Sequence, residues 1–395
     1  MKTGEVLQIG GGNIGRALIG QIMHEAGMRV VFADVNEDLV QSFNDEQGYP
    51  VNVVSIEGAR QVYVDGVSAI SSRDTQAMVD HIVSADLVTT AVGVGVLHKV
   101  APTLALGLMA RLKQRPKEEL HMTMIACENI EHNTETLRDY VLATLPDDEW
   151  RAKILQTVSF PNCAVDRIVP NIQHADGHPL TTTTEDYFQL AVDETALLSD
   201  MPPIGGIELT QDLDAVLAQK LFTLNGAHAA VAYWAHLKGY ETISQAMDDP
   251  DISALVDGLL LEVGVAVEES YPSVSKQNQQ AFAAKIIRRF KNPYLQDDPK
   301  RVGRNPKRKL GSGDRLVRPA LLALRAGEIP SFLSTAIVGA LRFEEDSDVQ
   351  AVELRADIRV QGIEAATAAV TGLSRQHPLV KQAVASYRIT ELTGA

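Results

Sequence analysis

The chain has 395 residues, 45% of them hydrophobic, and a net charge of −15. This length is long for one domain and comfortable for two. So acidic a chain has no overall attraction for nucleic acid, and no apolar run is long enough for a membrane span. The N-terminus lacks a secretory signal pattern, and two cysteines are too few for a disulfide framework or a multi-cysteine zinc site. We therefore expect a soluble cytoplasmic protein that holds no metal.

The first half of the chain alternates short apolar runs with helical stretches. Strands are expected at Glu5–Ile9, Arg29–Ala33, Asp86–Val92 and Met122–Cys127, with a helix from about residue 13 to residue 26. Strands that alternate with helices favour a parallel sheet covered on both faces. The pattern predicts an α/β fold with a Rossmann-like, doubly wound sheet.

The second half has helical periodicity and few strand signals. Helices are expected within Gln211–His236, Ile252–Ser270 and Val349–Leu373. The proline- and glycine-rich segment Pro202–Gly206 is typical of a boundary between domains. We predict a dinucleotide-binding domain over residues 1–200 and a mostly helical substrate domain over 201–395, with the active site in the cleft between them.

A glycine-rich motif, G-x-G-x-x-G, follows the first predicted strand and opens the first predicted helix. In this context it predicts a dinucleotide site formed by Gly10, Gly12, Asn13, Ile14 and Gly15. The free N–H groups of the helix N-terminus would bind the pyrophosphate. The alternative is a glycine-rich turn without a ligand.

An acidic residue ends the second predicted strand and favours NAD over NADP. Asp34 can accept hydrogen bonds from the ribose hydroxyls but would repel a 2′-phosphate, and no arginine follows directly. Small residues after the next strand, Thr90, Val92 and Gly93, could approach the nicotinamide ribose. A tight turn after a core strand explains these three residues equally well.

Three polar residues lie in one otherwise apolar helical segment. On an α-helix, Lys220, Asn225 and His228 fit within roughly 140° of arc. A desolvated lysine can act as the base in alcohol oxidation, and asparagine amides can hold the developing oxyanion. The alternatives are a solvated helix lysine and a core histidine with satisfied hydrogen bonds. Gly226, inside the segment, would allow another segment to approach closely.

A basic stretch interrupts the acidic chain. Between Lys285 and Arg318 there are twelve lysines and arginines and three aspartates. Such a run is either a solvated surface with ion pairs or an anion-binding site.

Eight segments, in order and spacing, resemble those of the polyol-specific long-chain dehydrogenases, the mannitol dehydrogenase family. The resemblance extends to about Leu322 and is closest to the branch that uses sugar phosphates. The segments are GGGNIGRALIG (10–20), FADVN (32–36), DLVTTAVG (86–93), IACEN (125–129), FPNCAVDRIVP (160–170), KLFTLNGAH (220–228), RRFKNPYLQDD (288–298) and RVGRNPKRKL (301–310).

The resemblance implies a metal-independent enzyme that interconverts D-mannitol 1-phosphate and D-fructose 6-phosphate with NAD. It implies Lys220 as general acid/base, Asn129 and Asn225 as oxyanion partners and His228 as the residue that orients the substrate. It also implies a monomer. Two departures concern the fine geometry of the substrate: Gly226 is displaced by one position from the family pattern, and Val94 and Gly95 stand where proline and asparagine are usual.

The basic stretch contains the R-V-G-R…R-K-L pattern of the phosphate-using branch, which implies a phosphate site. The candidate residues are Arg304, Lys307, Arg308 and Lys309. Two alternatives stay open. One is a family member that acts on an unphosphorylated polyol or a hexuronate, and the other is a non-catalytic NAD-binding regulatory protein.

Overall fold

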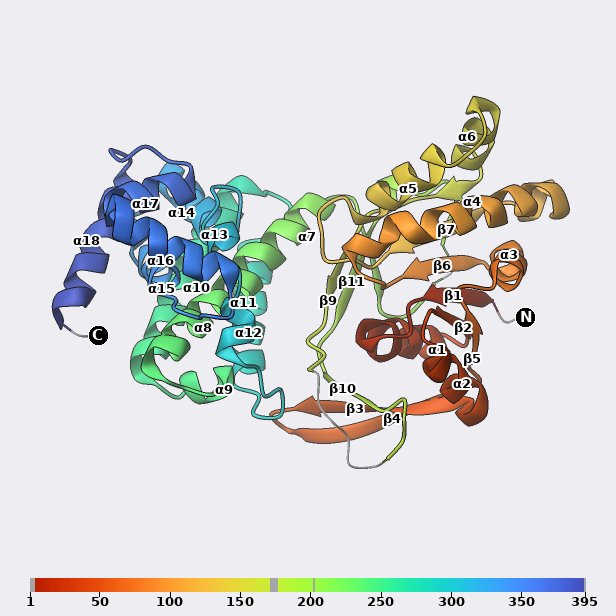
Figure 1. The fold of residues 1–395 in the computed structure, drawn as a ribbon, viewed down its shortest axis with the longest axis horizontal. Helices are drawn as coiled ribbons and strands as arrows, with labels where there is room; N and C mark the ends of the chain where they lie inside the picture. Colours follow the sequence, from red (N-terminus) through yellow and green to blue (C-terminus); the bar gives the residue numbers. More distant parts are fainter. Residues whose placement is uncertain (1–3, 171–176, 202, 394–395) are drawn as a thin grey trace. The chain divides into compact units, whose positions relative to one another are not determined.

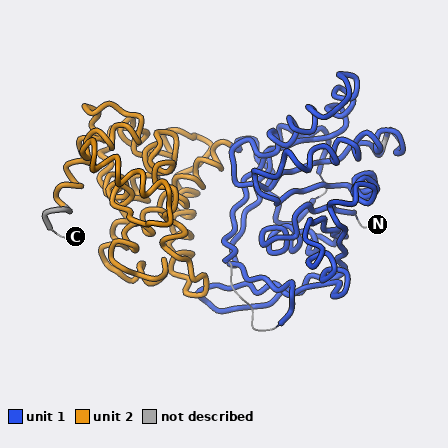
Figure 2. The backbone as a smooth tube through the Cα atoms, viewed as in Figure 1, with its two compact units in different colours: residues 1–213 blue, residues 214–395 orange. Residues whose placement is uncertain are grey.

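The computed structural model describes residues 4–170, 177–201 and 203–393, so Pro202 of the expected boundary segment lies outside the described residues. The chain forms two compact units, Met1–Leu213 and Asp214–Ala395, which Figure 2 colours separately. The first unit extends past the expected boundary at residue 200 because a further strand, β12 (Ile207–Thr210), pairs with β11 (Gln189–Asp193).

The first unit is built on a parallel sheet. Its described residues form six strands in the order β5-β2-β1-β6-β7-β8 (Figure 1). The order reverses between β1 and β6, as in a doubly wound dinucleotide-binding fold. The strands are β1 (Glu5–Ile9), β2 (Arg29–Asp34), β5 (Ser68–Ser71), β6 (Leu87–Thr90), β7 (Met122–Ala126) and β8 (Val158–Ser159).

Helices cover both faces of this sheet because neighbouring strand residues point to opposite sides. Val6 belongs to one core, with α1 and α2, whereas Leu7 belongs to the other, with α3, α4 and α5. The helices are a π-helical segment (Gly15–Gly20) continued by α1 (Gln21–Glu25), then α2 (Glu37–Glu46), α3 (Thr75–Ser84), α4 (Leu97–Gln114), α5 (Asn133–Ala143) and α6 (Asp148–Leu155).

Two smaller sheets, which the sequence pattern did not predict, complete the first unit. The order is β10-β3-β4 in one and β12-β11-β9 in the other. Their remaining strands are β3 (Gly48–Ser55), β4 (Gly58–Asp65), β9 (Cys163–Asp166) and β10 (Thr182–Glu185).

The second unit is helical, as expected. Helices α8, α10 and α15 pack on one another at its centre, and α8 is buried along most of its length. Asp249 caps the first N–H groups of α10 ahead of Pro250, and Gly239, with φ +79°, ends α8. The helices are α7 (Leu213–Gln219), α8 (Ala227–Lys238), α9 (Ile243–Ala246), α10 (Pro250–Ser270), α11 (Lys276–Phe290), α12 (Pro299–Gly303), α13 (Pro306–Lys309), α14 (Val317–Arg325), α15 (Ser331–Leu341), α16 (Val349–Gln361), α17 (Ile363–Thr371) and α18 (Pro378–Thr393).

Among the described residues, no helix combines the length and apolar character that a membrane span requires. In the same part of the chain, histidine, cysteine, aspartate and glutamate side chains form no group of three or more suited to a metal ion.

Two helix glycines should respond oppositely to alanine. A Cβ atom at Gly226 would lie 2.7 Å from the Arg315 carbonyl oxygen, whereas one at Gly264, in α10, would meet its nearest neighbours at 3.9 Å. We expect Gly226→Ala to destabilise the chain by about 1–3 kcal/mol through overpacking. Gly264→Ala should stabilise it by about 0.5–1 kcal/mol through helix propensity. Urea unfolding of both variants tests this, and equal shifts of the same sign would contradict it.

Candidate active site

The glycine-rich loop of the first unit is closely packed on one side and open on the other. Gly10 has φ +97°, and a Cβ there would lie 2.5 Å from the Ala91 carbonyl oxygen. A Cβ on Gly15 would collide with the Gly10 carbonyl, but at Gly12, which is exposed, a Cβ would meet nothing within 4 Å. Only glycine fits at positions 10 and 15, and Gly12 leaves room for a ligand to approach the backbone.

The carboxylate of Asp34 lies against this loop at the end of β2. Its Oδ2 accepts the Gly11 N–H at 2.7 Å, and its Oδ1 accepts the Asn36 N–H at 2.9 Å. The Arg16 guanidinium donates to the Gly11 carbonyl and, at 3.5 Å, to Asn13 Oδ1. Burial lowers the pKa of Arg16 although Tyr49 and Asp34 oppose that shift. The loop and the acidic strand end are therefore linked by hydrogen bonds.

The residues predicted to approach the nicotinamide ribose donate hydrogen bonds to a carboxylate for which the sequence predicted no role. Glu128 is only 5% exposed, and its Oε1 accepts hydrogen bonds from Thr90 Oγ1 at 3.1 Å and the Val92 N–H at 2.9 Å. Its Oε2 accepts the Gly93 N–H at 2.9 Å. In the sequence, Glu128 appeared only as the acidic residue of the IACEN segment (125–129), and no role was predicted for it. It directly precedes Asn129, which is exposed beyond the end of β7.

The polar motif of the second unit lies on one continuous helix, but part of this helix is not α-helical. Residues Lys220–Gly226 form a π-helical segment between α7 and α8. The expected α-helical spacing of Lys220, Asn225 and His228 was therefore wrong over this segment. Because π-helical hydrogen bonds join residues five apart, Lys220 and Asn225 fall on the same side of the segment. Such segments occur often at functional sites.

A buried glutamine ties the π-helical segment to α11. Gln279 is 1% exposed and donates to Thr223 Oγ1 at 3.0 Å, while its own oxygen accepts from Gln219 at 2.9 Å. On the opposing side, the Arg315 carbonyl lies so close to Gly226 that a side chain would collide with it. This is the close approach that the glycine predicted.

His228 has two partners from the segment before α12. Its Nε2 lies 3.1 Å from Asp297 Oδ2, and its ring stacks on Phe290 with centroids 4.9 Å apart. Arg301 donates to the other carboxylate oxygen of Asp297. Burial alone would raise the pKa of Asp297, but the adjacent His228 and Arg301 lower it below its ordinary value. His228 thus has a buried carboxylate beside it, although its Nε2 makes no well-aligned hydrogen bond within the described residues.

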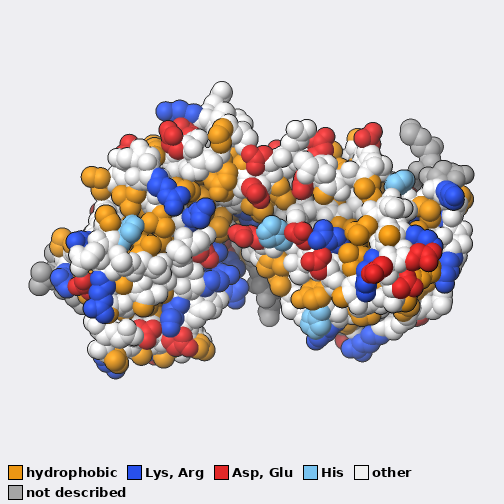
Figure 3. Space-filling view, turned by 90° about the horizontal axis from the view of Figure 1, so that it is seen from above, with side chains coloured by type: hydrophobic (Ala, Val, Ile, Leu, Met, Phe, Trp, Pro, Cys, Tyr) orange, Lys and Arg blue, Asp and Glu red, His pale blue; other side chains and the backbone are white. Residues whose placement is uncertain are grey.

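The four predicted phosphate residues differ in their surroundings. On the face drawn in Figure 3, basic and acidic side chains are interspersed over both units. Lys307 is paired with Glu353 at 3.1 Å and Asp357 at 3.0 Å, both on α16. Arg304 and Arg308 are exposed. The ion pairs make Lys307 the least suited of these residues to a phosphate.

Lys309 is buried, unlike the other three residues. It is 3% exposed, donates to the Val302 carbonyl and lies 5.9 Å from the centre of the Tyr233 ring. Burial, and then the charges of Arg315 and Arg308, lower the pKa of Lys309 to about 7. The second unit thus brings Arg308, Lys309 and Arg315 together next to the motif helix. Arg315 was not among the predicted residues.

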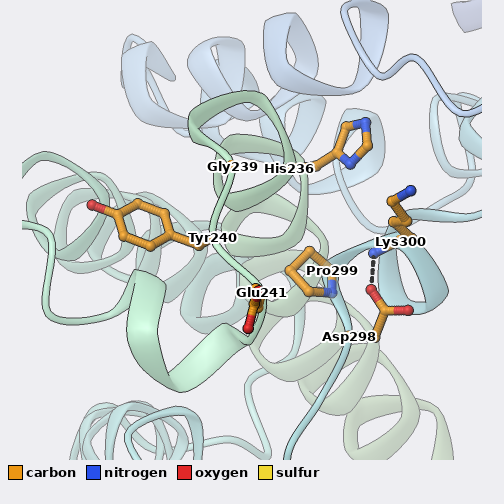
Figure 4. A pocket seen from close by; sticks show the side chains of 7 residues that line it. All are labelled: His236, Gly239, Tyr240, Glu241, Asp298, Pro299 and Lys300. Carbon is orange, nitrogen blue, oxygen red and sulfur yellow. Dashed lines mark hydrogen bonds between the residues drawn. The ribbon is translucent and has the colours of Figure 1, made fainter.

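A surface pocket of about 380 Å³ lies at the C-terminal end of α8 (Figure 4). It contains none of the predicted site residues. Three of its polar residues have partners: His236 Nε2 lies 2.7 Å from the Glu344 carbonyl oxygen, Lys300 pairs with Glu345 at 3.0 Å, and Asp298 accepts the Lys300 N–H. Its lining residues are His236, Gly239, Tyr240, Glu241, Asp298, Pro299 and Lys300.

Two solved structures are similar to almost the whole chain at low identity. A D-sorbitol dehydrogenase in substrate-free form has a TM-score of 0.85 and 17% identity, over 99% of this chain and 94% of that one. Mannitol 2-dehydrogenase of Pseudomonas fluorescens, in ternary complex with NAD and D-mannitol, has a TM-score of 0.73 and 17% identity, over 99% of this chain and 92% of that one. These likenesses concern the fold.

Two family models match the chain in sequence. Residues 4–206 match the Mannitol dehydrogenase Rossmann domain, and residues 212–389 match the Mannitol dehydrogenase C-terminal domain. The two matches agree with the parallel-sheet unit and the helical unit in turn. The chain belongs to the mannitol dehydrogenase family.

Proposed function

We propose that this protein is an NAD-dependent oxidoreductase that interconverts D-mannitol 1-phosphate and D-fructose 6-phosphate, a mannitol-1-phosphate 5-dehydrogenase. The observation that carries the proposal is the group of cations beside the motif helix. The charges of Arg308 and Arg315 both act on the buried Lys309, and the guanidinium of Arg315 also pairs with Asp314 at 2.7 Å. The backbone carbonyl of Arg315 packs against the helix at Gly226. A phosphorylated polyol supplies both a hydroxyl for the motif and an anion for these cations.

The glycine-rich loop fits a dinucleotide. The open space at Gly12 admits a pyrophosphate to the backbone N–H groups, and Gly10 and Gly15 cannot carry side chains. Asp34 accepts two backbone N–H groups and keeps oxygen lone pairs for ribose hydroxyls, while its charge disfavours a 2′-phosphate. Bound NAD would accept hydride from the alcohol carbon, and bound NADH would return it to the ketone.

Lys220 is proposed to take the proton from the reacting hydroxyl and to return it in the reverse direction. It is partly buried, and a desolvated lysine is easier to deprotonate than one in water. The amide groups of Asn129 and Asn225 can each donate to a substrate oxygen that gains negative charge. His228 is proposed to orient the substrate through a ring nitrogen.

Arg304 and Arg308 are the proposed direct phosphate contacts. Both are exposed, and a guanidinium can bind a phosphate through two N–H groups. Lys309, from its buried position, adds a positive charge that acts together with theirs when it is protonated. Lys307 is proposed to contribute mainly through its ion pairs with α16.

A second candidate is a dehydrogenase for an unphosphorylated polyol or a hexuronate. The two similar solved structures favour it, because they are named for sorbitol and mannitol, and one holds D-mannitol. An unphosphorylated polyol gives the exposed arginines no anion, whereas a hexuronate offers them a carboxylate, so comparison of substrates separates the candidates.

Gly12→Ala tests the cofactor site without disturbing the fold. Because a methyl group has room at this position, we expect the thermal unfolding temperature to stay that of the wild type. The same methyl group would occupy the space proposed for the pyrophosphate, so NADH affinity should fall about tenfold or more. Fluorescence titration with NADH measures the affinity. Unchanged binding would contradict the proposed position of the cofactor.

Lys220→Ala tests proton transfer. We expect turnover to fall by about 10²–10⁴-fold, because general acid/base catalysis contributes that much, while NADH affinity stays near the wild-type value. The matched control is Lys238→Ala on α8, whose lysine pairs with Asp249 and Asp251 at the surface. Turnover near wild type in the Lys220 variant would refute the assigned role.

The substrate is tested by following NADH oxidation with D-fructose 6-phosphate and D-fructose side by side. We expect rapid oxidation with the phosphate ester only. Arg304→Gln and Arg308→Gln should each raise KM for the ester about 10–100-fold, because each removes a charged hydrogen bond, with little change in kcat. Arg325→Gln, which neutralises an exposed arginine of α14, is the control. Preference for fructose would favour the unphosphorylated alternative.

A further inference from the structure

The segment Arg288–Asp298 resembles the family, yet the proposed function assigns it no role. The structure gives it one, because this segment supplies two neighbours of the His228 ring. Phe290, the last residue of α11, stacks on the imidazole with an interplanar angle of 21°. Asp297 lies just before α12 and places Oδ2 at 3.1 Å from Nε2. The histidine ring is therefore fixed in both plane and rotation.

Asp297 is itself rigidly held. It is 6% exposed, its Oδ1 accepts from Arg301 and its backbone carbonyl accepts the Ile243 N–H at 3.0 Å. A buried carboxylate needs such partners to stay charged. The lowered pKa of Asp297, the net result of burial opposed by His228 and Arg301, is consistent with a carboxylate that is ionised at neutral pH.

We propose that Asp297 is a positioning residue that keeps neutral His228 in the tautomer with its proton on Nε2. The Asp297 carboxylate, 3.1 Å from Nε2, repels a lone pair at that nitrogen and so favours a proton there, which leaves Nδ1 a lone pair that can accept a hydrogen bond from a substrate hydroxyl. This inference rests on the proposed role of His228 in orienting a polyol chain. Asp297 acts through His228 and does not contact the substrate itself.

The tautomer of His228 can be read in the unmodified protein. Nitrogen-15 NMR correlations of the imidazole rings, recorded at alkaline pH so that the rings are neutral, distinguish a protonated nitrogen from a bare one. The His228→Gln variant identifies the signal. We expect Nε2 to be protonated and Nδ1 bare. The opposite tautomer would overturn the proposal, and this measurement does not depend on any Asp297 variant folding.

Asp297→Asn tests the consequence for the reaction, with Asp298→Asn as the matched control. Asp298 is exposed and caps α12 by accepting the Lys300 N–H at 2.8 Å, away from His228. We expect Asp297→Asn to lower kcat/KM for D-fructose 6-phosphate about 10–100-fold, mainly through KM, with NADH affinity unchanged. Asp298→Asn should behave as the wild type. Equal kinetics for the two variants would overturn the proposal.

A double variant separates positioning from general destabilisation. If Asp297 acts through His228, adding Asp297→Asn to His228→Gln should change kcat/KM less than twofold. Independent, multiplying losses would overturn the proposal. Failure of the proposed function is recognised separately, as a wild-type protein that oxidises NADH with neither sugar phosphates nor free ketoses.

Discussion

Strand polarity is the constraint on which the first unit depends. Because β1, β6 and β7 are parallel neighbours, their carboxyl ends emerge at the same edge of the sheet, with Ile9 beside Thr90 and Thr90 beside Ala126. The turn at Gly10, the loop at Gly93 and the Glu128 carboxylate therefore become adjacent although they are distant in sequence. A buried carboxylate at this edge satisfies the N–H groups of a loop that leaves the sheet.

The second unit fixes its polar residues by a different means. Its motif helix is buried over most of α8, so neighbouring elements supply polar groups to it. Gln279 donates a hydrogen bond to Thr223, and the carboxylate of Asp297 lies 3.1 Å from His228 Nε2. These groups come from α11 and from the segment that joins it to α12, so this part of the unit supports the motif helix. The rest of the basic stretch follows directly in the chain and places its cations near the same helix.

The sequence predicted those features that depend on local pattern. Strands β1, β2 and β7 are apolar runs, and the glycine spacing marks the turn between β1 and its helix. The smaller sheets escaped because β10 is a run of threonines and a glutamate, and β4 is largely exposed, so neither carries an apolar signal. The boundary between the units lies later in the chain than predicted for the same reason, because β12 is short and half-exposed and carries no clear apolar pattern.

The candidate site was predicted in part. Gly10, Asp34 and Lys220 can be found from motif and spacing, and the resemblance adds their roles. Glu128, Asp297 and Arg315 could not be found in this way, because each acts through a contact to a residue far away in the chain. The π-helical segment also escaped, since its composition reads as an ordinary apolar helix. Tertiary packing, rather than helix propensity, decides both these distant contacts and the π-helical geometry.

The π-helical segment gives this helix one residue of tolerance in length. A π-helical turn holds one more residue than an α-helical turn. Deleting one residue between Lys220 and Asn225 would let the turn relax to α geometry, and the residues on either side would keep their register because the turn alone had absorbed the extra residue. Lys220 and Asn225 would then be four residues apart and would still share one side of the helix. Homologues that keep this chemistry can therefore be one residue shorter within this segment but not within α8, where a deletion would rotate all preceding residues by about 100°.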